Sequence, residues 1–344
     1  MSQRIPVLHT LKKVVFERRV PGQLVIQMTD KCNARCPQCE MRVTNKYDRS
    51  QMTVDEIKRN IDAAAERGIQ VLSFTGGEPL LMQDELIELM HHAGTQGIQF
   101  LRTGTNGYVL KNPDAPNWER RVRTMAERLA ETKIRNFWIS IDSAVPDVHE
   151  RMRGFPKLIA GIERALPIFH EAGIYPSANL GVNRNVGGTQ TWDLYPEQFQ
   201  NEADYLDAFG AAMRQSMQKF YRFVGDLGFT IVNCCYPMSI DEAEQTQGLD
   251  AVYAATSLDR VIKFTRGERA RLFKALFDTV PEFRSQLRIF SPRASLYTLY
   301  REYADIATGE AYGCRGGIDF WFVNSVDGNA YPCGYRGQIG RAHV

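Results

Sequence analysis

Apolar runs of strand length alternate along the chain with longer segments in which apolar residues recur every three or four positions. This alternation is typical of β/α units that build a parallel sheet. Several of the short runs are nearly continuous in apolar character, as expected where helices cover a parallel sheet. Six such units predict an α/β fold, a partial (β/α)6 TIM-like barrel with its active face at the carboxyl ends of the strands. The predicted strands span residues 24–28, 70–74, 99–103, 137–141, 178–182 and 229–234.

Capping residues mark where several helices begin. Thr53 and Glu56 have the spacing of a capping box, and Thr265 and Glu268 repeat it before two further helices. A Gly at position 68 ends the first of these helices. The other helices with clear amphipathic spacing are predicted over residues 84–93, 157–172 and 204–224.

The chain divides into a core and flanking segments. Residues 1–20 form an N-terminal extension, residues 21–236 form the barrel, and residues 237–311 form linking helices. Within the barrel, residues 183–227 are longer than a crossover between two strands requires. We expect a substrate lid over the active face there, with plain structural elaboration as the alternative. Beyond the linking helices, an Asp-Gly step at 327–328 between alternating runs predicts a β-hairpin.

Charge and composition exclude several classes of function. The 344 residues carry 42 Lys and Arg against 40 Asp and Glu, a net charge of +2, so neither nucleic acid nor a membrane is expected as an obligate partner. No stretch approaches the roughly 18 apolar residues of a membrane span, and the basic residues near the start do not fit a signal peptide. The seven cysteines are odd in number and clustered, which favours metal ligation in a reducing cytoplasm over a disulfide framework.

Three of these cysteines directly follow the first predicted strand. Cys32, Cys36 and Cys39 have the spacing C-x3-C-x2-C. Cysteine thiolates normally hold an iron–sulfur cubane with one thiolate per iron, so three ligands would leave one iron open for chemistry. A small zinc site is the alternative, but zinc prefers a closed set of four ligands, and no further His or Cys lies nearby in sequence.

Polar and glycine-rich segments follow the next strands, where barrel enzymes carry their binding residues. Residues 75–79 read Thr-Gly-Gly-Glu-Pro, and paired glycines allow a close backbone approach, although they also suit a plain turn. Asn106 follows the third strand, and for it a binding role and a turn are equally favoured. Ser140 and Asp142 end the fourth strand, Asn183 follows the fifth, and Cys234 and Cys235 end the sixth with side chains expected on opposite faces.

The cysteine spacing, followed one β/α unit later by Gly-Gly-Glu-Pro, resembles the radical S-adenosylmethionine (SAM) superfamily. The resemblance implies a [4Fe-4S] cluster on the three cysteines, SAM chelated by the open iron, and reductive cleavage of SAM to a 5′-deoxyadenosyl radical. It assigns Gly76, Gly77, Glu78 and Pro79 to the methionine end of SAM. It further assigns Ser140 and Asp142 to the ribose, Asn106 to the pocket and Asn183 to adenine or ribose. Arg153 could pair with the SAM carboxylate, but a solvated basic turn is the favoured reading of its segment.

A second resemblance concerns the C-terminal cysteines. Cys314, Gly328 and Cys333 match the opening of the SPASM/twitch motif, which carries auxiliary clusters in this subgroup, whereas a structural pair is the alternative. Residues 312–344 would then begin such a module, with an auxiliary [4Fe-4S] cluster in the full-length chain. No further cysteine follows. Residues 339–344 match one frame of a common sequencing adapter, so we expect an artefact tail on a C-terminally truncated chain.

The substrate cannot be read from the sequence. The SPASM/twitch resemblance slightly favours maturation of a peptide or protein, and a small molecule in cofactor, sugar or antibiotic biosynthesis is the alternative. A reductant such as flavodoxin or ferredoxin is expected as a partner. An iron–sulfur electron carrier, or a binding module with a structural metal, is the non-enzymatic alternative, and both are poorly matched to the Gly-Gly-Glu-Pro motif.

Overall fold

The computed structural model describes residues 15–16, 22–39, 49–237, 259–306 and 316–334. Nine strands in these segments form one sheet in the order β7-β6-β5-β4-β3-β2-β1-β8-β9. All neighbouring strands are parallel except β8 and β9, which form an antiparallel pair. The strands are β1 (Gln23–Thr29), β2 (Val71–Gly76), β3 (Phe100–Thr105), β4 (Ile134–Ser140), β5 (Ser177–Gly181), β6 (Ile231–Cys235), β7 (Arg288–Phe290), β8 (Phe320–Val323) and β9 (Ala330–Tyr331).

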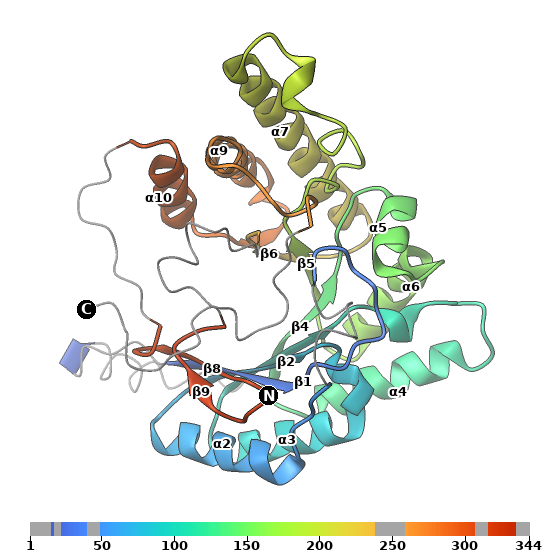
Figure 1. Ribbon diagram of the computed structural model, residues 1–344. Coiled ribbons are helices and arrows are strands. Elements are labelled where there is room, and N and C mark those ends of the chain that lie inside the picture. Colours follow the sequence, from blue (N-terminus) through green and yellow to red (C-terminus); the bar gives the residue numbers. More distant parts are fainter. Residues whose placement is uncertain (1–14, 17–21, 40–48, 238–258, 307–315, 335–344) are drawn as a thin grey trace.

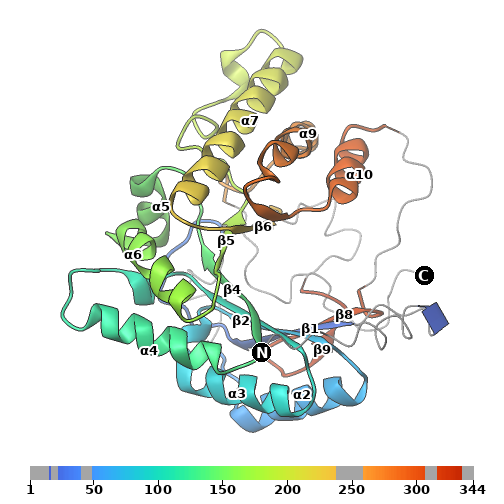
Figure 2. The same cartoon turned by 180° about the vertical axis from the view of Figure 1, so that it is seen from behind.

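The helices lie on the outer face of the curved sheet, as Figures 1 and 2 show from opposite sides. Both predicted capping boxes are present, since the Thr53 and Thr265 hydroxyls accept from the backbone N–H groups of Glu56 and Glu268. The helices are α2 (Val54–Glu66), α3 (Gln83–Thr95), α4 (Trp118–Ala130), α5 (Pro146–Arg153), α6 (Leu158–Glu171), α7 (Glu202–Asp226), α9 (Arg266–Phe283) and α10 (Arg293–Tyr303). Short 3-10 turns are η2 (Pro79–Met82), η3 (Tyr108–Leu110) and η4 (Pro196–Gln198). Within the described residues, no helix is long and apolar enough to cross a membrane.

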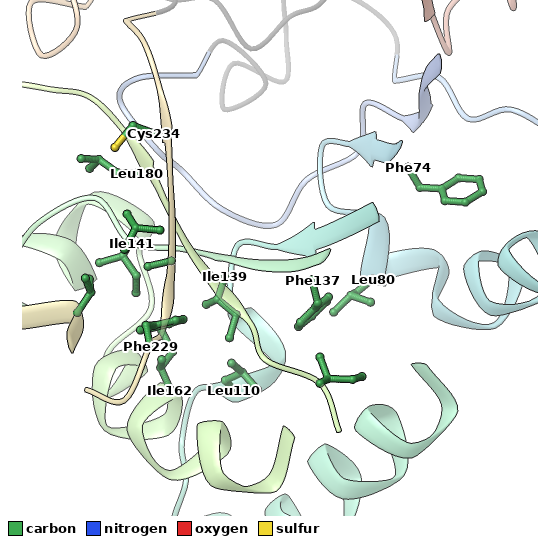
Figure 3. Packing of buried hydrophobic residues seen from close by; sticks show 14 of the residues in the cluster. Phe74, Leu80, Leu110, Phe137, Ile139, Ile141, Ile162, Leu180, Phe229 and Cys234 are labelled. Carbon is green, nitrogen blue, oxygen red and sulfur yellow. The ribbon is translucent and has the colours of Figure 1, made fainter. Parts of the chain in front are cut away.

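The hydrophobic core lies between the sheet and these helices. Figure 3 shows part of it, including Phe74 of β2, Phe137 and Ile139 of β4 and Ile162 of α6. Successive residues of a strand point to opposite faces of the sheet. Because these apolar side chains point outward to the helices, the residues between them point to the inner face. Helices cover the outer face of the sheet, as expected, whereas the inner face lines a cavity.

The prediction of a partial (β/α)6 barrel is confirmed, with additions at both edges of the sheet. β7 pairs with β6, and β8 pairs in parallel with β1, so a segment far along the chain extends the sheet beside its first strand. The hairpin predicted at 327–328 is also confirmed: Gly328 has a φ of 69° and its N–H donates to the Asn324 carbonyl over 2.9 Å. Within the described residues the sheet does not close.

The long segment at 183–227 lies away from the cavity on the inner face of the sheet. None of its residues, all of which the structure describes, lines the cavity on the inner face of the sheet. Its helix α7 buries Phe209, Met213 and Phe220 in the main core, as a crossover helix on the outer face would. This placement favours plain structural elaboration, and the substrate lid stays a prediction without support from it. The division of the chain into domains stays a prediction.

Candidate functional site

A cavity of about 380 Å³, hereafter the barrel cavity, lies on the inner face of the sheet. Its volume is within the range of roughly 300–1,000 Å³ found for small-molecule sites. A larger hollow of about 660 Å³ lies beside η3 and α4, but the residues described around it include no thiol and no carboxylate. The barrel cavity, in contrast, gathers most of the predicted site residues: Cys32, Cys36, Cys39, Gly76, Gly77, Glu78, Pro79, Asn106, Ser140 and Asp142.

The cysteine loop forms one wall of the barrel cavity. Cys36 is buried, Cys32 and Cys39 are partly exposed, and the Cys39 N–H donates to the Cys36 carbonyl over 3.2 Å. Burial raises the pKa of the Cys36 thiol to about 12 and also raises the pKa of Cys32. Metal binding requires thiolates and releases their protons, so cluster loading would have to overcome this cost of burial.

The donor set fits a cluster better than a single ion. Among the described residues, no three His, Cys, Asp or Glu side chains are grouped as ligands of one metal ion. A cubane instead spreads its thiolates over separate irons, and the three cysteines line a common cavity with room beside them. They are the residues that could hold the cluster.

The two glycines at 76 and 77 allow close contact with the protein's own backbone. A Cβ on Gly76 would lie 2.5 Å from the Thr29 carbonyl oxygen, and one on Gly77 would lie 2.2 Å from that of Lys31. The Gly77 and Glu78 N–H groups donate to these same two carbonyls over 2.7 and 2.9 Å. The glycines therefore fix the end of β2 against the start of the cysteine loop, a role that the sequence did not indicate.

Glu78 is fully buried and joins the ends of β2 and β3. Its Oε1 accepts from the Leu80 N–H over 3.1 Å and its Oε2 from the Asn106 N–H over 2.6 Å. Burial nevertheless raises its pKa to about 7, because these donors offset only part of the desolvation. The carboxylate lines the barrel cavity, and its assignment to the methionine end of SAM stays a prediction.

Asn106 both lines the cavity and shapes the backbone around it. Its Nδ2 donates to Asn33 Oδ1 over 2.8 Å and lies 3.7 Å from Cys32 Sγ, while its Oδ1 accepts from the Tyr108 N–H over 2.9 Å. The side chain thus links the end of β3 to the first cysteine. The turn role of Asn106 is thus present, and its binding role stays a prediction that its place on the cavity wall allows.

Asp142 forms a buried ion pair with Arg153 of α5. Arg153 Nε and Nη2 donate to the two carboxylate oxygens over 2.6 and 2.7 Å, with the Asp142 side chain 0% and the Arg153 side chain 11% exposed. Burial alone would lower the pKa of Arg153, but Asp142 and the nearby Cys36 outweigh it and raise that pKa. The reading of Arg153 as a solvated turn is wrong, and both partners line the barrel cavity.

His149 supports this pair from the outer side. It is fully buried, and its Nδ1 accepts from the Asp142 N–H over 3.1 Å. Burial lowers the pKa of His149 to about 4, so the imidazole is neutral at pH 7. A neutral imidazole leaves Arg153 as the one cation in contact with Asp142 among the described residues.

The remaining predicted residues divide between the cavity and its surroundings. Ser140 lines the cavity, whereas Asn183 does not, although the structure describes it. Asn183 Nδ2 donates to the carbonyls of Asp142 and Gly181 over 2.9 and 2.7 Å, which ties the ends of β4 and β5 together. Its predicted contact with adenine or ribose stays a prediction without support from this placement.

Of the two C-terminal cysteines, the structure describes Cys333 but not Cys314. Cys314 and residues 339–344 lie outside the described residues, so nothing tests the artefact tail. Cys333 follows β9 and is partly exposed, and the next residue, Gly334, lines the barrel cavity. On β6 the two adjacent thiols point to opposite faces as expected: Cys234 packs in the core and Cys235 lines the cavity.

Sequence reasoning missed a polar row on the inner face of the sheet. It comprises side chains at alternate positions of β3 to β6 that line the barrel cavity: Arg102, Trp138, Asn179 and Asn233. Period-two alternation within these strands was the available indication, but the strands were interpreted as continuous apolar runs.

Comparison with known families agrees with this site. Residues 26–194 match the family model described as the Radical SAM superfamily, so the predicted radical SAM domain is confirmed. The match begins in β1, before the cysteine loop, and ends beyond β5, so it includes the cysteine loop and the ends of β2 to β5, but not the cavity residues of β6 and β8.

Two named relatives illustrate the extent of the similarity. GTP 3′,8-cyclase of Alkaliphilus metalliredigens (strain QYMF) is 30% identical over 159 residues, 45% of this chain and 46% of the relative. AdoMet-dependent heme synthase of Methanosarcina barkeri (strain Fusaro / DSM 804) is 23% identical over 322 residues, 92% of this chain and 77% of the relative. The matches to GTP 3′,8-cyclases thus span about half of those proteins, and the enzyme names agree with the expectation of an enzyme.

A solved structure supports the fold. SuiB of Streptococcus suis bound to S-adenosylmethionine superposes with a TM-score of 0.57 over 95% of this chain and 64% of SuiB, at 16% sequence identity. At this identity the likeness concerns the fold alone. It agrees with the open α/β barrel described above.

Proposed function

We propose, from the membership of residues 26–194 in the radical SAM superfamily, that this chain is an enzyme that cleaves SAM reductively to begin a radical reaction. The observation that supports this most directly is a single cavity lined by Cys32, Cys36 and Cys39 together with the Gly-Gly-Glu-Pro motif. When bound, a [4Fe-4S] cluster supplies the electron that converts SAM to methionine and a 5′-deoxyadenosyl radical. The electron comes from an external reductant such as flavodoxin or ferredoxin.

The chain's own residues would seat and shield the reactants. Cys32, Cys36 and Cys39 would ligate the cluster, and the backbone at 76–79 would hold the methionine end of SAM. Asn106, Ser140 and Asp142 line the same cavity and remain candidates for the rest of the SAM molecule. Enclosure by the sheet would keep water and other hydrogen donors away from the radical.

Arg153 is a further candidate for binding SAM. Its guanidinium already contacts Asp142 through Nε and Nη2, so the remaining N–H groups are the ones available to a second carboxylate. Because Asp142 fixes the guanidinium, a contact with the SAM carboxylate would require little further ordering of the side chain.

The substrate remains open between two classes. We retain a peptide or protein as the slightly favoured class, which rests on the SPASM/twitch resemblance of Cys314 and Cys333. A small molecule is the second candidate, and it is supported by the relative that covers most of this chain, whose name is AdoMet-dependent heme synthase. We also propose an auxiliary [4Fe-4S] cluster in the full-length chain. An iron content well above about four atoms per chain after reconstitution would support this second cluster. We further propose a cytoplasmic location, on the basis of the clustered cysteines.

The test is anaerobic reconstitution with iron and sulfide, followed by SAM and dithionite, with 5′-deoxyadenosine quantified by mass spectrometry. Wild type should form 5′-deoxyadenosine, and Cys36→Ala should reduce it to background because one iron loses its ligand. Cys234→Ala is the matched control, since this thiol is buried in the core 3.6 Å from the Tyr221 hydroxyl and faces away from the cavity. Equal cleavage by wild type and Cys36→Ala would refute the assignment.

A further inference from the structure

Arg102 places an unpaired positive charge in the barrel cavity. It lies on β3 with its side chain on the inner face, partly buried, and it lines the cavity. Its guanidinium makes no hydrogen bond or ion pair to any residue in the described segments. The guanidinium carbon Cζ lies over the Trp138 ring, 6.0 Å from the ring centroid. Burial of a cation without an acidic partner is costly unless a ligand supplies one.

The other charged groups in the cavity already have partners. Arg153 and Asp142 neutralise one another, and both oxygens of Glu78 accept from backbone N–H groups. Neither carboxylate forms a hydrogen bond or ion pair with Arg102; burial lowers the pKa of Arg102, and the Cys235 thiol offsets part of that shift. Among the charged side chains described around this cavity, Arg102 is therefore the one without a hydrogen-bonded partner.

Two amide side chains on β5 and β6 line the same cavity as Arg102. Asn179 lies opposite Asn233 in the register of β5 and β6, and Asn233 Nδ2 donates to Asn179 Oδ1 over 2.7 Å. This contact leaves Nδ2 of Asn179 without a partner in the described part of the chain, and the residue lines the cavity. A guanidinium and an amide N–H together form a donor set suited to a carboxylate or a phosphate.

An aromatic wall completes the site. Phe320 and Phe322 of β8 line the barrel cavity together with Trp138. Apolar walls with a few polar groups that fix the orientation of the ligand are the usual composition of a small-molecule site. The ligand should therefore carry an anionic group on an apolar body.

The distance from the cysteine loop is suitable for a substrate. Arg102 pairs in register with Ser73, which precedes Gly76 by three residues. At a rise of about 3.3 Å per residue, the backbone of Arg102 lies roughly 10 Å along the strands from the start of the Gly-Gly-Glu-Pro motif. A substrate anchored at Arg102 could thus extend its reacting carbon toward the cysteine loop.

We propose that Arg102, assisted by Asn179, binds a carboxylate or phosphate group of the substrate, whose apolar body lies against Trp138 and the β8 phenylalanines. The orientation of the substrate toward the cysteines rests on the proposed radical SAM function, whereas the anion site itself does not. Both a small organic acid and an acidic group of a peptide satisfy this chemistry.

The test uses three probes that differ in charge on one apolar ring: benzoate, phenyl phosphate and neutral benzamide. Their binding to anaerobically reconstituted protein with SAM is measured by calorimetry and by ligand-observed NMR. One of the two anions should bind at least about tenfold more tightly than benzamide, because a charge-assisted bidentate contact is lost in the amide. A preference for phenyl phosphate would identify a phosphate site, and a preference for benzoate a carboxylate site.

Variants of Arg102 test whether this residue causes the preference for anionic probes. Arg102→Gln should abolish the preference for the anion, and Arg102→Lys should retain part of it as a point charge without the planar fork. Arg164→Gln is the matched control, since Arg164 also lies over a Trp ring, 5.2 Å from the Trp118 centroid, but is exposed and paired with Asp114.

Two results would overturn the inference: equal affinity of wild type for the anions and benzamide, or a preference that survives Arg102→Gln. The wild-type comparison requires no variant, so it decides the matter even if Arg102→Gln does not fold. Formation of 5′-deoxyadenosine by wild type is measured separately. If the protein binds the anion through Arg102 but cleaves no SAM, the proposed radical SAM function is refuted and the anion site is not.

Discussion

The ion pair between Asp142 and Arg153 should be one of the most sensitive points of the fold. Asp142→Asn removes the charge from a side chain that is 0% exposed and leaves the Arg153 guanidinium, 11% exposed, without its counterion. The amide also turns a donor toward a guanidinium that can only donate, so one of the two contacts at 2.6 and 2.7 Å is lost outright. Breaking a buried pair from one side typically costs about 3–5 kcal/mol.

The measurement is urea unfolding of the protein without added iron, followed by circular dichroism. Arg153→Met should cost a similar amount, because it leaves an unpaired buried carboxylate instead. The double variant should lose clearly less than the sum of the two single variants, since no unpaired charge remains in the site. This comparison separates the charge from the packing of the two side chains.

An exposed pair on the same molecule provides the control. Arg123 and Glu171 are 2.8 Å apart, with side chains 40% and 62% exposed, so Glu171→Gln should cost less than about 1 kcal/mol. If Asp142→Asn costs no more than Glu171→Gln, the reasoning from burial is refuted. Additive losses in the double variant would show that the two residues act independently.

Two further predictions follow from buried groups near the site. Gly77→Ala places a Cβ 2.2 Å from the Lys31 carbonyl oxygen, so it should lower the free energy of unfolding by about 1–3 kcal/mol and also reduce the amount of iron bound after reconstitution. Gly225→Ala is the control, because a Cβ there has no atom nearer than 4.0 Å, and it should reduce neither quantity. His149 has its pKa lowered from 6.5 to about 4, so the folded protein should lose up to roughly 3 kcal/mol as pH falls through that interval. His149→Gln should flatten this slope in urea unfolding at pH 4 to 7, and an unchanged slope would contradict the burial argument.

Much of the fold could be predicted because its local patterns are strong. All six predicted strands exist, and the boundaries differ by at most three residues, as in β4, which begins at Ile134 rather than at residue 137. β7 was missed because a three-residue strand with two exposed side chains has too little pattern to detect. The parallel pairing of β8 with β1 joins positions about 300 residues apart, and no local pattern encodes such a contact.

The site was predicted where residue type and spacing are specific, and missed where burial determines the role. The cysteine loop and the glycine motif meet in one cavity, because carboxyl ends of parallel strands share an edge. Arg153 was misread because its segment is rich in charge. A helical spacing was nevertheless present: Val148 and Met152 are four residues apart, and His149 and Arg153 share the adjoining row on the same buried side of α5.

The barrel cavity itself has its origin in small residues on the inner face of the sheet. A Cβ on Gly104 would lie 2.2 Å from the Trp138 ring, so this glycine of β3 is what allows the indole to lie across the sheet. Gly181 of β5 lines the cavity, and a Cβ there would meet no atom within 4 Å. Barrel interiors are normally filled by bulky branched side chains. Gly181 instead leaves open space on the inner face, in the cavity where the unpaired Arg102 can reach a ligand rather than a neighbouring side chain.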